Sequence, residues 1–253
     1  MNNRGFFTLF AKEVWRFLKV WVQTILAPVV TVFLYLLVFA SVLSDNIEVY
    51  KGVGYSEFLI PGLIMMAVLQ NAFANSSSSL FQAKQNGSII FILLSPVSSM
   101  EFYLAYVLAS IVRGICVGIG VWIVTWIFTI LSVYNLMMIT GFAVLGSGIL
   151  GSLGLIASIW ADKWDHISAF QNFVILPLSF LSGVFFSIES LPPFWSKVSY
   201  FNPFFYLIDG FRFGFLGTSE ISPYFSLMIG SIFFLFVSAL CIGMLKSGYK
   251  LRD

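Results

Sequence analysis

The sequence predicts an all-α membrane protein with six transmembrane helices, and three observations support this prediction. Of 253 residues, 59% are hydrophobic and 9% are charged, whereas a soluble domain carries roughly 25% charged residues. Mean hydropathy is +0.97. Several charge-free runs are long enough to cross a bilayer as helices. This composition excludes a disordered chain, a basic nucleic-acid-binding protein and a secreted disulfide scaffold.

An amphipathic helix is predicted first, at residues 4–19. Its aromatic and apolar positions recur at helical spacing, and its basic positions fall on the opposite face: Phe10, Val14, Phe17 and Trp21 against Lys12, Arg16 and Lys19. We expect this interface helix to lie on the cytoplasmic leaflet, with its aromatic side in the acyl chains and its basic side near anionic headgroups. A plain membrane anchor is the alternative.

The six spans are predicted as helices because continuous apolar runs, unlike the short alternating segments of a barrel, close their backbone hydrogen bonds internally. They lie at about residues 20–43, 58–83, 102–131, 136–160, 167–188 and 221–245. Residues 114–161 form one charge-free run of about twice the spanning length, so this run must turn back once, and Tyr134-Asn135 is the best turn. We treat residues 1–253 as a single transmembrane domain.

The distribution of basic residues predicts the orientation. An even number of spans puts both termini on one side of the membrane. Nine basic residues fall on that side (Arg4, Lys12, Arg16, Lys19, Lys84, Lys163, Lys246, Lys250, Arg252), three fall opposite (Lys51, Lys197, Arg212), and Arg113 lies within the third span. By the positive-inside rule, both termini are cytoplasmic.

Polar side chains within the spans are candidates for lining a translocation pathway. In the second span they share one helical face, at Asn71, Asn75, Ser78 and Gln82. Arg113 is the only charge within the predicted spans, and a charge at membrane depth needs a partner, water or a route to the interface. Two alternatives stay open: the stripe serves interhelical hydrogen bonding, and Arg113 marks the inner boundary of its span.

Small residues recur at helical spacing in the third and fourth spans. They are Gly114 and Gly118 in the third, and Ser147, Gly151, Gly154 and Ser158 in the fourth. Small side chains let helix backbones approach closely in a membrane, so we interpret these positions as packing contacts.

A short cytoplasmic helix is predicted between the second and third spans, at about residues 84–98. Gly87 precedes its apolar patch at residues 89–94, and Ser95-Pro96 ends it. Exposed apolar residues on a cytoplasmic loop suit docking to a soluble partner. Contact with lipid alone is the alternative.

The longest outer segment, residues 189–220, is rich in Phe, Tyr and Pro. Aromatic rings favour the headgroup boundary, so we expect this segment to re-enter the outer leaflet.

Motifs for catalysis and metal binding are absent from the sequence. There is no Gly-x-x-x-x-Gly-Lys-Ser/Thr phosphate loop, no Gly-x-Ser-x-Gly elbow and no His-Glu-x-x-His. His166 stands beside Asp162 and Asp165 without further ligands, so we expect no metal site there. The chain is therefore predicted not to be an enzyme.

Several strings resemble one family in particular. They are FLIPGLIMM at residues 58–66, LLSPV at 93–97, GVFF at 183–186 followed by LPPFW at 191–195, NP at 202–203 and GFRFG at 210–214. Together with the order of elements, they resemble the membrane subunit of an ABC-2 type transporter, and within it the YadH-type permeases of Gram-negative inner membranes.

This resemblance implies an ATP-driven exporter. The permease would be a homodimer in the bacterial inner membrane, surrounded by lipid, and bound by two ATPase subunits that hold ATP and Mg. The short inner helix would be the coupling helix that docks the ATPase, through Gly87, Ile89, Ile90, Phe91, Leu93, Leu94 and Pro96. The outer re-entrant region would include Pro192, Pro193, Asn202, Pro203, Asp209 and Arg212. The cargo would be amphipathic, lipid-linked or hydrophobic. Acidic residues, frequent in the coupling helices of the family, are missing from residues 89–94.

Two other functions stay open. An intramembrane enzyme acting on a lipid headgroup could use Asp209 and Arg212, although a structural ion pair explains these two residues more simply. An ATP-independent channel would need polar stripes through several spans, and the second span alone supplies one.

Overall fold

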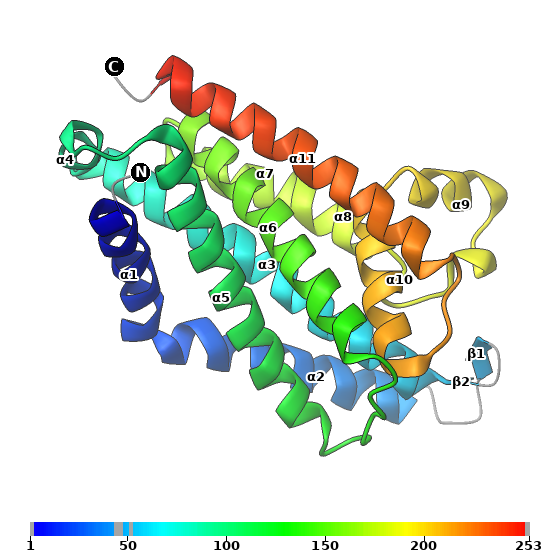
Figure 1. The fold of residues 1–253 in the computed structure, drawn as a ribbon. Helices are drawn as coiled ribbons and strands as arrows, with labels where there is room; N and C mark the ends of the chain where they lie inside the picture. The colour runs from blue at the N-terminus through cyan, green and yellow to red at the C-terminus, as the bar shows by residue number, and fades with distance from the viewer. Residues whose placement is uncertain (1–2, 43–47, 51–52, 251–253) are drawn as a thin grey trace.

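Long helices run side by side through most of the chain in the computed structural model, which describes residues 3–42, 48–50 and 53–250 (Figure 1). The elements are α1 (Asn3–Lys19), the π-helical segment η1 (Val22–Leu26), α2 (Ala27–Val42), β1 (Glu48–Tyr50), β2 (Val53–Gly54), α3 (Tyr55–Gln85), α4 (Ile89–Leu94), α5 (Ser99–Thr125), α6 (Leu136–Trp160), α7 (Trp164–Phe170), the π-helical segment η2 (Gln171–Ile175), α8 (Leu176–Phe180), the 3₁₀ turn η3 (Ile188–Ser190), α9 (Pro193–Tyr200), α10 (Pro203–Leu216) and α11 (Pro223–Ser247). The two short strands pair antiparallel.

The bundle has a buried centre and an apolar exterior. α3 and α6 are mostly buried, whereas only 17% of the first apolar window (residues 22–39) and 22% of that in α11 are buried. An apolar helix surface of this kind suits contact with lipid. Five helices in the described part of the chain are long and apolar enough to cross a membrane.

The fifth predicted span, residues 167–188, differs from the prediction. Its helical part is Trp164–Phe180, 17 residues interrupted by the π-helical segment η2. At 1.5 Å per residue this is about 25 Å, shorter than the ~30 Å hydrocarbon core. Beyond it, Gly183 takes a left-handed conformation and Val184 is fully buried. The apolar residues after Phe180 are therefore folded into the protein, and six spans remain a prediction.

The third predicted span, residues 102–131, is also wrong at its end. α5 stops at Thr125, and the chain then makes turns and an extended segment before α6. The start of α6 agrees with the prediction, because Asn135 Oδ1 accepts a hydrogen bond from the Met138 amide (3.2 Å) and caps the helix.

Small residues bring α3 and α6 into close contact, which confirms their interpretation as packing positions. Ser76 Oγ on α3 donates to the backbone oxygen of Gly151 at 2.6 Å. A Cβ on Gly154 would lie 2.6 Å from the backbone oxygen of Phe73. Gly114 and Gly118 on α5 lie against side chains: Gly114 against those of Ser147 and Val68, and Gly118 against that of Val68. The central helices are thus in contact at backbone distance.

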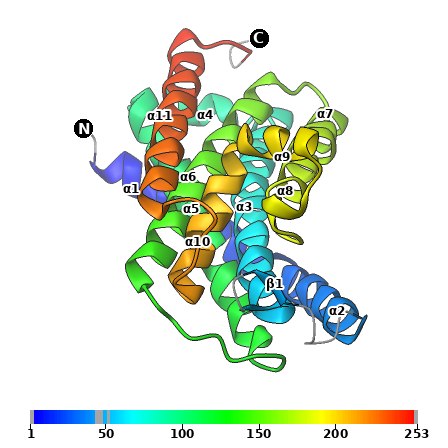
Figure 2. The same ribbon diagram turned by 90° about the vertical axis from the view of Figure 1, so that its right-hand side faces the viewer.

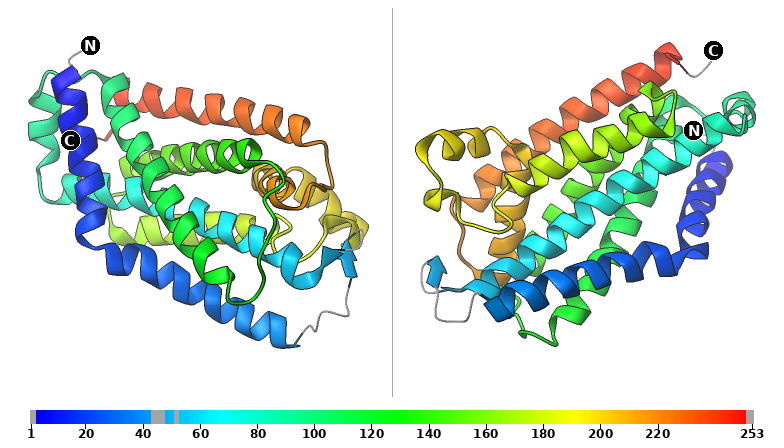
Figure 3. Two further views of the ribbon diagram at one scale, coloured as in Figure 1. Left: turned by 60° about the horizontal axis from the view of Figure 1, so that its bottom comes forward. Right: turned by 180° about the vertical axis from the view of Figure 1, so that it is seen from behind.

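The described ends of the chain lie at the same end of the bundle as α4, and β1, β2 and α9 lie at the other (Figures 1 and 2). α1 runs across that end instead of along the bundle (Figure 3). Leu43, the predicted end of the first span, and Lys51 and Arg252, two basic residues used for the orientation, lie outside the described residues.

A lysine from α3 caps the carboxyl end of α6. Lys84 Nζ donates to the backbone oxygens of Ser158 (3.2 Å), Ile159 (2.9 Å) and Ala161 (3.0 Å). The last carbonyls of a helix have no partner within the helix, and a cation is favourable beside them. Lys84 therefore belongs to α3 and caps α6. It is not part of the separate short helix that the sequence predicted at residues 84–98.

Replacing Lys84 by methionine is expected to lower the free energy of unfolding by about 2 kcal/mol, because the carbonyls of three buried residues lose a charged donor. A melting curve in detergent measures this loss. Lys163→Met, at an exposed lysine nearby, is the matched control. Equal melting temperatures for the two variants would show that the cap contributes nothing.

Candidate functional site

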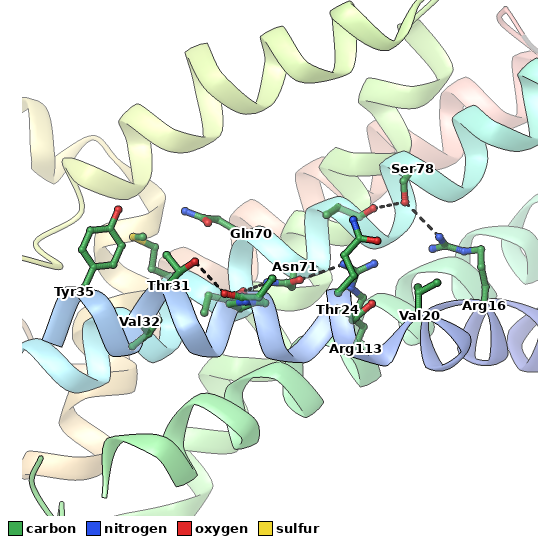
Figure 4. Close-up of a pocket in the computed structure, with 16 residues that line it drawn as sticks. Arg16, Val20, Thr24, Thr31, Val32, Tyr35, Gln70, Asn71, Ser78 and Arg113 are labelled. Carbon is green, nitrogen blue, oxygen red and sulfur yellow. Dashed lines mark hydrogen bonds between the residues drawn. The ribbon is translucent and has the colours of Figure 1, made fainter. Parts of the chain in front are cut away.

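A polar cavity of about 550 Å³ lies between the α1–η1–α2 segment and helices α3 and α5. Its walls carry two arginines, Arg16 from α1 and Arg113 from α5, and polar side chains from α3 (Figure 4). A cavity of 300–1,000 Å³ with a few convergent polar groups is typical of a ligand site. This cavity is the candidate functional site.

Arg16 joins α1 to α3. Its Nη2 donates to the backbone oxygen (2.7 Å) and to the side-chain Oδ1 (2.8 Å) of Asn75, and its Nη1 donates to Ser78 Oγ (3.4 Å). Its Nε donates to the carboxylate of Glu13 at 3.3 Å. These contacts fix the amino-terminal helix to the bundle.

The predicted position of Arg16 among lipid headgroups is therefore wrong. Leu9, Glu13 and Phe17 are buried, spaced four residues apart, on the face of α1 that packs against α5. Phe17 thus contacts protein and not acyl chains. Arg16 follows Glu13 by three residues, so it lies beside this buried face. Lys12 and Lys19 are exposed, and Phe10 is half-buried.

Arg113 lies near the middle of the 27-residue α5, about 21 Å from its start at 1.5 Å per residue. Its Nη2 donates to Asn71 Oδ1 at 3.2 Å, and Asn71 Nδ2 in turn donates to the Ala67 backbone oxygen at 3.1 Å. α5 begins at Ser99 and not near Val112, so Arg113 does not stand at the start of its helix, and its depth in the membrane stays a prediction.

Three of the five predicted pathway residues line the cavity: Asn71, Ser78 and Arg113. Asn75 is fully buried and donates to Ser110 Oγ at 3.3 Å as well as accepting from Arg16. Gln82 is exposed near the end of α3, away from the cavity. Gln70, which the predicted stripe does not include, also lines the cavity. A polar residue within an apolar run was the available signal. Gln70, however, lies outside the helical face that the predicted stripe defines.

α4 presents an exposed apolar surface at the end of the bundle. Phe91 is 77% exposed and Leu94 is 78% exposed, and Ile90, Leu93 and Pro96 are exposed beside them. Ile89 is buried and belongs to the same hydrophobic cluster as Leu9 of α1. Gly87 precedes the helix with a left-handed φ of 68°. The helix covers residues 89–94 and not 84–98 as predicted, because α3 continues to Gln85 and Ser95 ends α4.

A groove of about 420 Å³ separates α4 from α1. Arg4, Thr8 and Lys12 line one wall, and Phe91 and Pro96 line the other. The interface helix and the short inner helix therefore share one surface.

Asp209 and Arg212 on α10 are buried and bonded to the backbone. The Asp209 carboxylate accepts from the amides of Glu220 (3.0 Å) and Ile221 (3.1 Å). Arg212 donates to the backbone oxygens of Phe58 (3.2 Å) and Gly183 (2.7 Å), and its guanidinium carbon lies 3.7 Å from the centre of the Phe58 ring. Their exposed fractions are 1% and 2%. This arrangement holds loops together and offers no open position for a substrate.

The remaining residues of the predicted outer region begin helices. Pro192 and Pro193 begin α9, and Pro203 is the first residue of α10. Asn202 Oδ1 accepts from the Phe204 amide at 3.0 Å, and its Nδ2 donates to the Leu178 backbone oxygen at 2.6 Å. α9 lies on the surface, whereas α10 packs against α3, α6 and α11.

No group of three or more potential metal ligands is found among the residues that the structure describes. The Asp162 carboxylate pairs with Lys250 Nζ at 2.7 Å, and this hydrogen bond lowers the pKa of Asp162. His166 Nδ1 accepts from the Asp162 amide at 3.3 Å.

Comparison with known proteins identifies the family. A family model described as "ABC-2 type transporter" matches residues 4–216, from α1 to the end of α10. The chain belongs to the ABC-2 type transporter family. Over 246 residues it is 36% identical to the inner membrane transport permease YadH of Escherichia coli (strain K12), which covers 97% of this chain and 96% of YadH. YadH of Shigella flexneri gives the same values. Nodulation protein J of Rhizobium leguminosarum bv. viciae is 32% identical over 88 residues, 35% of this chain and 32% of that protein.

This ABC-2 type chain is therefore the membrane subunit of a transporter and a multi-pass protein of the inner membrane. The region matched by the family model contains the Arg16–Arg113 cavity, α4 and the buried α10.

Proposed function

We propose that the chain is the permease subunit of an ATP-driven exporter. Two copies of the chain would assemble with two separate ATPase subunits, which bind ATP and Mg. The complex would move an amphipathic, lipid-linked or hydrophobic molecule outward across the bacterial inner membrane. Membership in the ABC-2 type family supports this proposal.

The apolar surface of α4 is the observation on which the proposal depends. Four large side chains, Ile90, Phe91, Leu93 and Leu94, are exposed on a six-residue helix at the end of the bundle. Exposed apolar clusters of this kind mark interaction sites. The groove between α4 and α1 extends the surface, and its basic wall suits a partner with acidic side chains.

The proposed orientation in the membrane rests on the position of α4 relative to the two ends of the chain. A docked ATPase must be cytoplasmic, because ATP is there. The described ends of the chain lie at the end where α4 lies (Figure 1), and most basic residues of the sequence are predicted on that side. Both termini are then cytoplasmic, and α9 and α10 belong to the outer half.

Replacing Phe91 by aspartate is expected to reduce copurification of the ATPase subunit about 30-fold, because a central aromatic anchor contributes ~2 kcal/mol to an interface. The measurement is the amount of ATPase that is recovered with the tagged permease from membranes expressing both chains.

Two control variants accompany this test. Phe91→Leu keeps an apolar side chain and should retain the partner. Met137→Asp adds the same charge at another exposed position, which is 85% exposed at the start of α6, where a carboxylate is favourable. Undiminished recovery of the ATPase with Phe91→Asp would refute docking at α4.

A further inference from the structure

A groove of about 750 Å³ lies on the outside of the bundle, between α5, α6 and α11. It shares no lining residue with the Arg16–Arg113 cavity. No charged side chain lines it among the residues that the structure describes. Most of its walls are apolar side chains from the three helices, among them Leu104, Leu108, Val144, Leu145, Leu227 and Phe234.

The groove is closed at one end by a tyrosine. Tyr103 Oη on α5 lies within hydrogen-bond distance of Ser152 Oγ on α6 (2.8 Å) and of Ser238 Oγ on α11 (2.6 Å). These contacts join the three helices toward the end of the bundle where α4 lies. From there α5 and α11 diverge on either side of α6 (Figures 1 and 3). The groove is therefore a wedge that opens toward the other end of the bundle, with α6 as its floor.

The floor of the groove lacks a side chain at Gly141, where a Cβ would meet nothing within 4 Å. Two other glycines of α6 differ from it. A Cβ on Gly148 would lie 2.9 Å from the Phe234 ring, and a Cβ on Gly151 would lie 2.8 Å from Ser110 Cβ. Those two glycines serve helix packing. The space over Gly141 is not used for packing within the chain, so it is open to another molecule.

The chemistry of the walls selects hydrocarbon. The hydroxyl of Thr140 donates to the Leu136 backbone oxygen at 2.9 Å, and the hydroxyl of Tyr103 is bonded to the two serines. A polar ligand would therefore gain little from these groups. Leu108 and Val144 are partly exposed in the groove, which continues into the apolar outer face of α11, where Leu235 is 67% exposed. In a multi-pass membrane protein, lipid covers such a face.

We propose that this groove binds one acyl chain of a membrane phospholipid. The chain lies over Gly141 between α5 and α11, and its head group stays outside the groove, at the end of the bundle opposite to α4. The bilayer is as apolar as the groove, so the hydrophobic effect does not favour the groove over bulk lipid. Retention comes from the van der Waals contacts that three walls make with one chain. This proposal goes beyond the proposed function, because the lipid is a part of the folded permease and not its cargo.

The test is lipid retention by the purified full chain in detergent, measured by native mass spectrometry. We expect the wild-type chain to retain dipalmitoyl-phosphatidylethanolamine about tenfold more than dihexanoyl-phosphatidylethanolamine, because the short chains make fewer contacts with the walls. Dipalmitoyl-phosphatidylglycerol should be retained equally well, because no charged side chain lines the described groove. Equal retention of the short-chain lipid, or a strong preference for one head group, would overturn recognition of the acyl chain.

A matched pair of variants tests the position of the chain. Gly141→Leu fills the floor of the groove and should lower retention of the dipalmitoyl lipid about tenfold. Gly243→Leu adds the same side chain on α11, outside the groove, where a Cβ also meets nothing within 4 Å. This variant should retain the lipid like the wild-type chain. Both variants add apolar surface, so a difference between them reports on the groove and not on general contact with lipid.

Val144→Phe, at a floor position that is 41% exposed, keeps the test decisive if Gly141→Leu does not fold, and it should lower retention in the same way. Equal lipid retention by the groove variants and Gly243→Leu would overturn the proposal. If Gly141→Leu lost a dimer and kept its lipid, a second copy of the chain would cover the groove, which would also overturn it. This assay contains no ATPase and the α4 recovery assay compares no lipids, so each proposal fails on its own.

Discussion

Replacing Gly154 by leucine is expected to eliminate most of the folded protein. The Cβ alone would lie 2.6 Å from the backbone oxygen of Phe73 and 3.1 Å from the backbone nitrogen of Ser77. A backbone cannot rotate away as a side chain can, so α3 and α6 must separate, and the hydrogen bond from Ser76 to Gly151 is lost with them. We expect a loss of at least about 3 kcal/mol, measured as the monodisperse fraction after detergent extraction and as the melting temperature.

Gly141 provides the matched control on the same helix. A Cβ at this position meets nothing within 4 Å. Gly141→Leu should therefore fold, with a small gain from helix propensity. If Gly154→Leu and Gly141→Leu melt together, close approach of the backbones is not what holds α3 to α6.

Replacing Arg212 by methionine is the second large effect. The backbone oxygens of Phe58 and Gly183 lose a charged donor in a buried position, and the Phe58 ring loses the cation above it. We expect a loss of about 3–5 kcal/mol, because α10 is no longer tied to the start of α3 and to the loop after α8. The yield of folded protein and its melting temperature measure this loss.

This experiment also separates a structural role from a catalytic one. If Arg212 were a catalytic residue of a lipid-modifying enzyme, Arg212→Met would give folded but inactive protein. The structure predicts instead that little folded protein is recovered. Lys197→Met, a control at an exposed lysine on α9, should be recovered normally. Normal folding of Arg212→Met would contradict the structural role.

The sequence predicted the helices well where composition determines them. The boundaries of α1, α3, α6 and α11 lie within a few residues of the prediction, because long apolar runs and the Asn135 cap are local signals. The predictions failed where tertiary contacts decide. Apolar residues after Phe180 read as a continued span, yet Gly183 turns the chain so that its backbone oxygen reaches Arg212. No local pattern distinguishes an apolar residue that faces lipid from one that is folded back into protein.

The site was predicted only in part for the same reason. A helical stripe identified Asn71 and Ser78, and charge at membrane depth identified Arg113. Arg16 was assigned to the lipid surface, because an amphipathic pattern shows that two faces differ but not what each face contacts. Its hydrogen bonds to Asn75 join residues 59 positions apart in the sequence. Only the fold brings them together.

The cap that Lys84 forms on α6 has a mechanical consequence. Lys84 lies one turn before Gly87, where the chain leaves α3 and enters α4. α4 therefore follows directly after the point where Lys84 joins the last turn of α3 to the last turn of α6. We therefore expect the capped ends of α3 and α6 to move together when α4 is displaced, with the change of chain direction at Gly87, outside the pair.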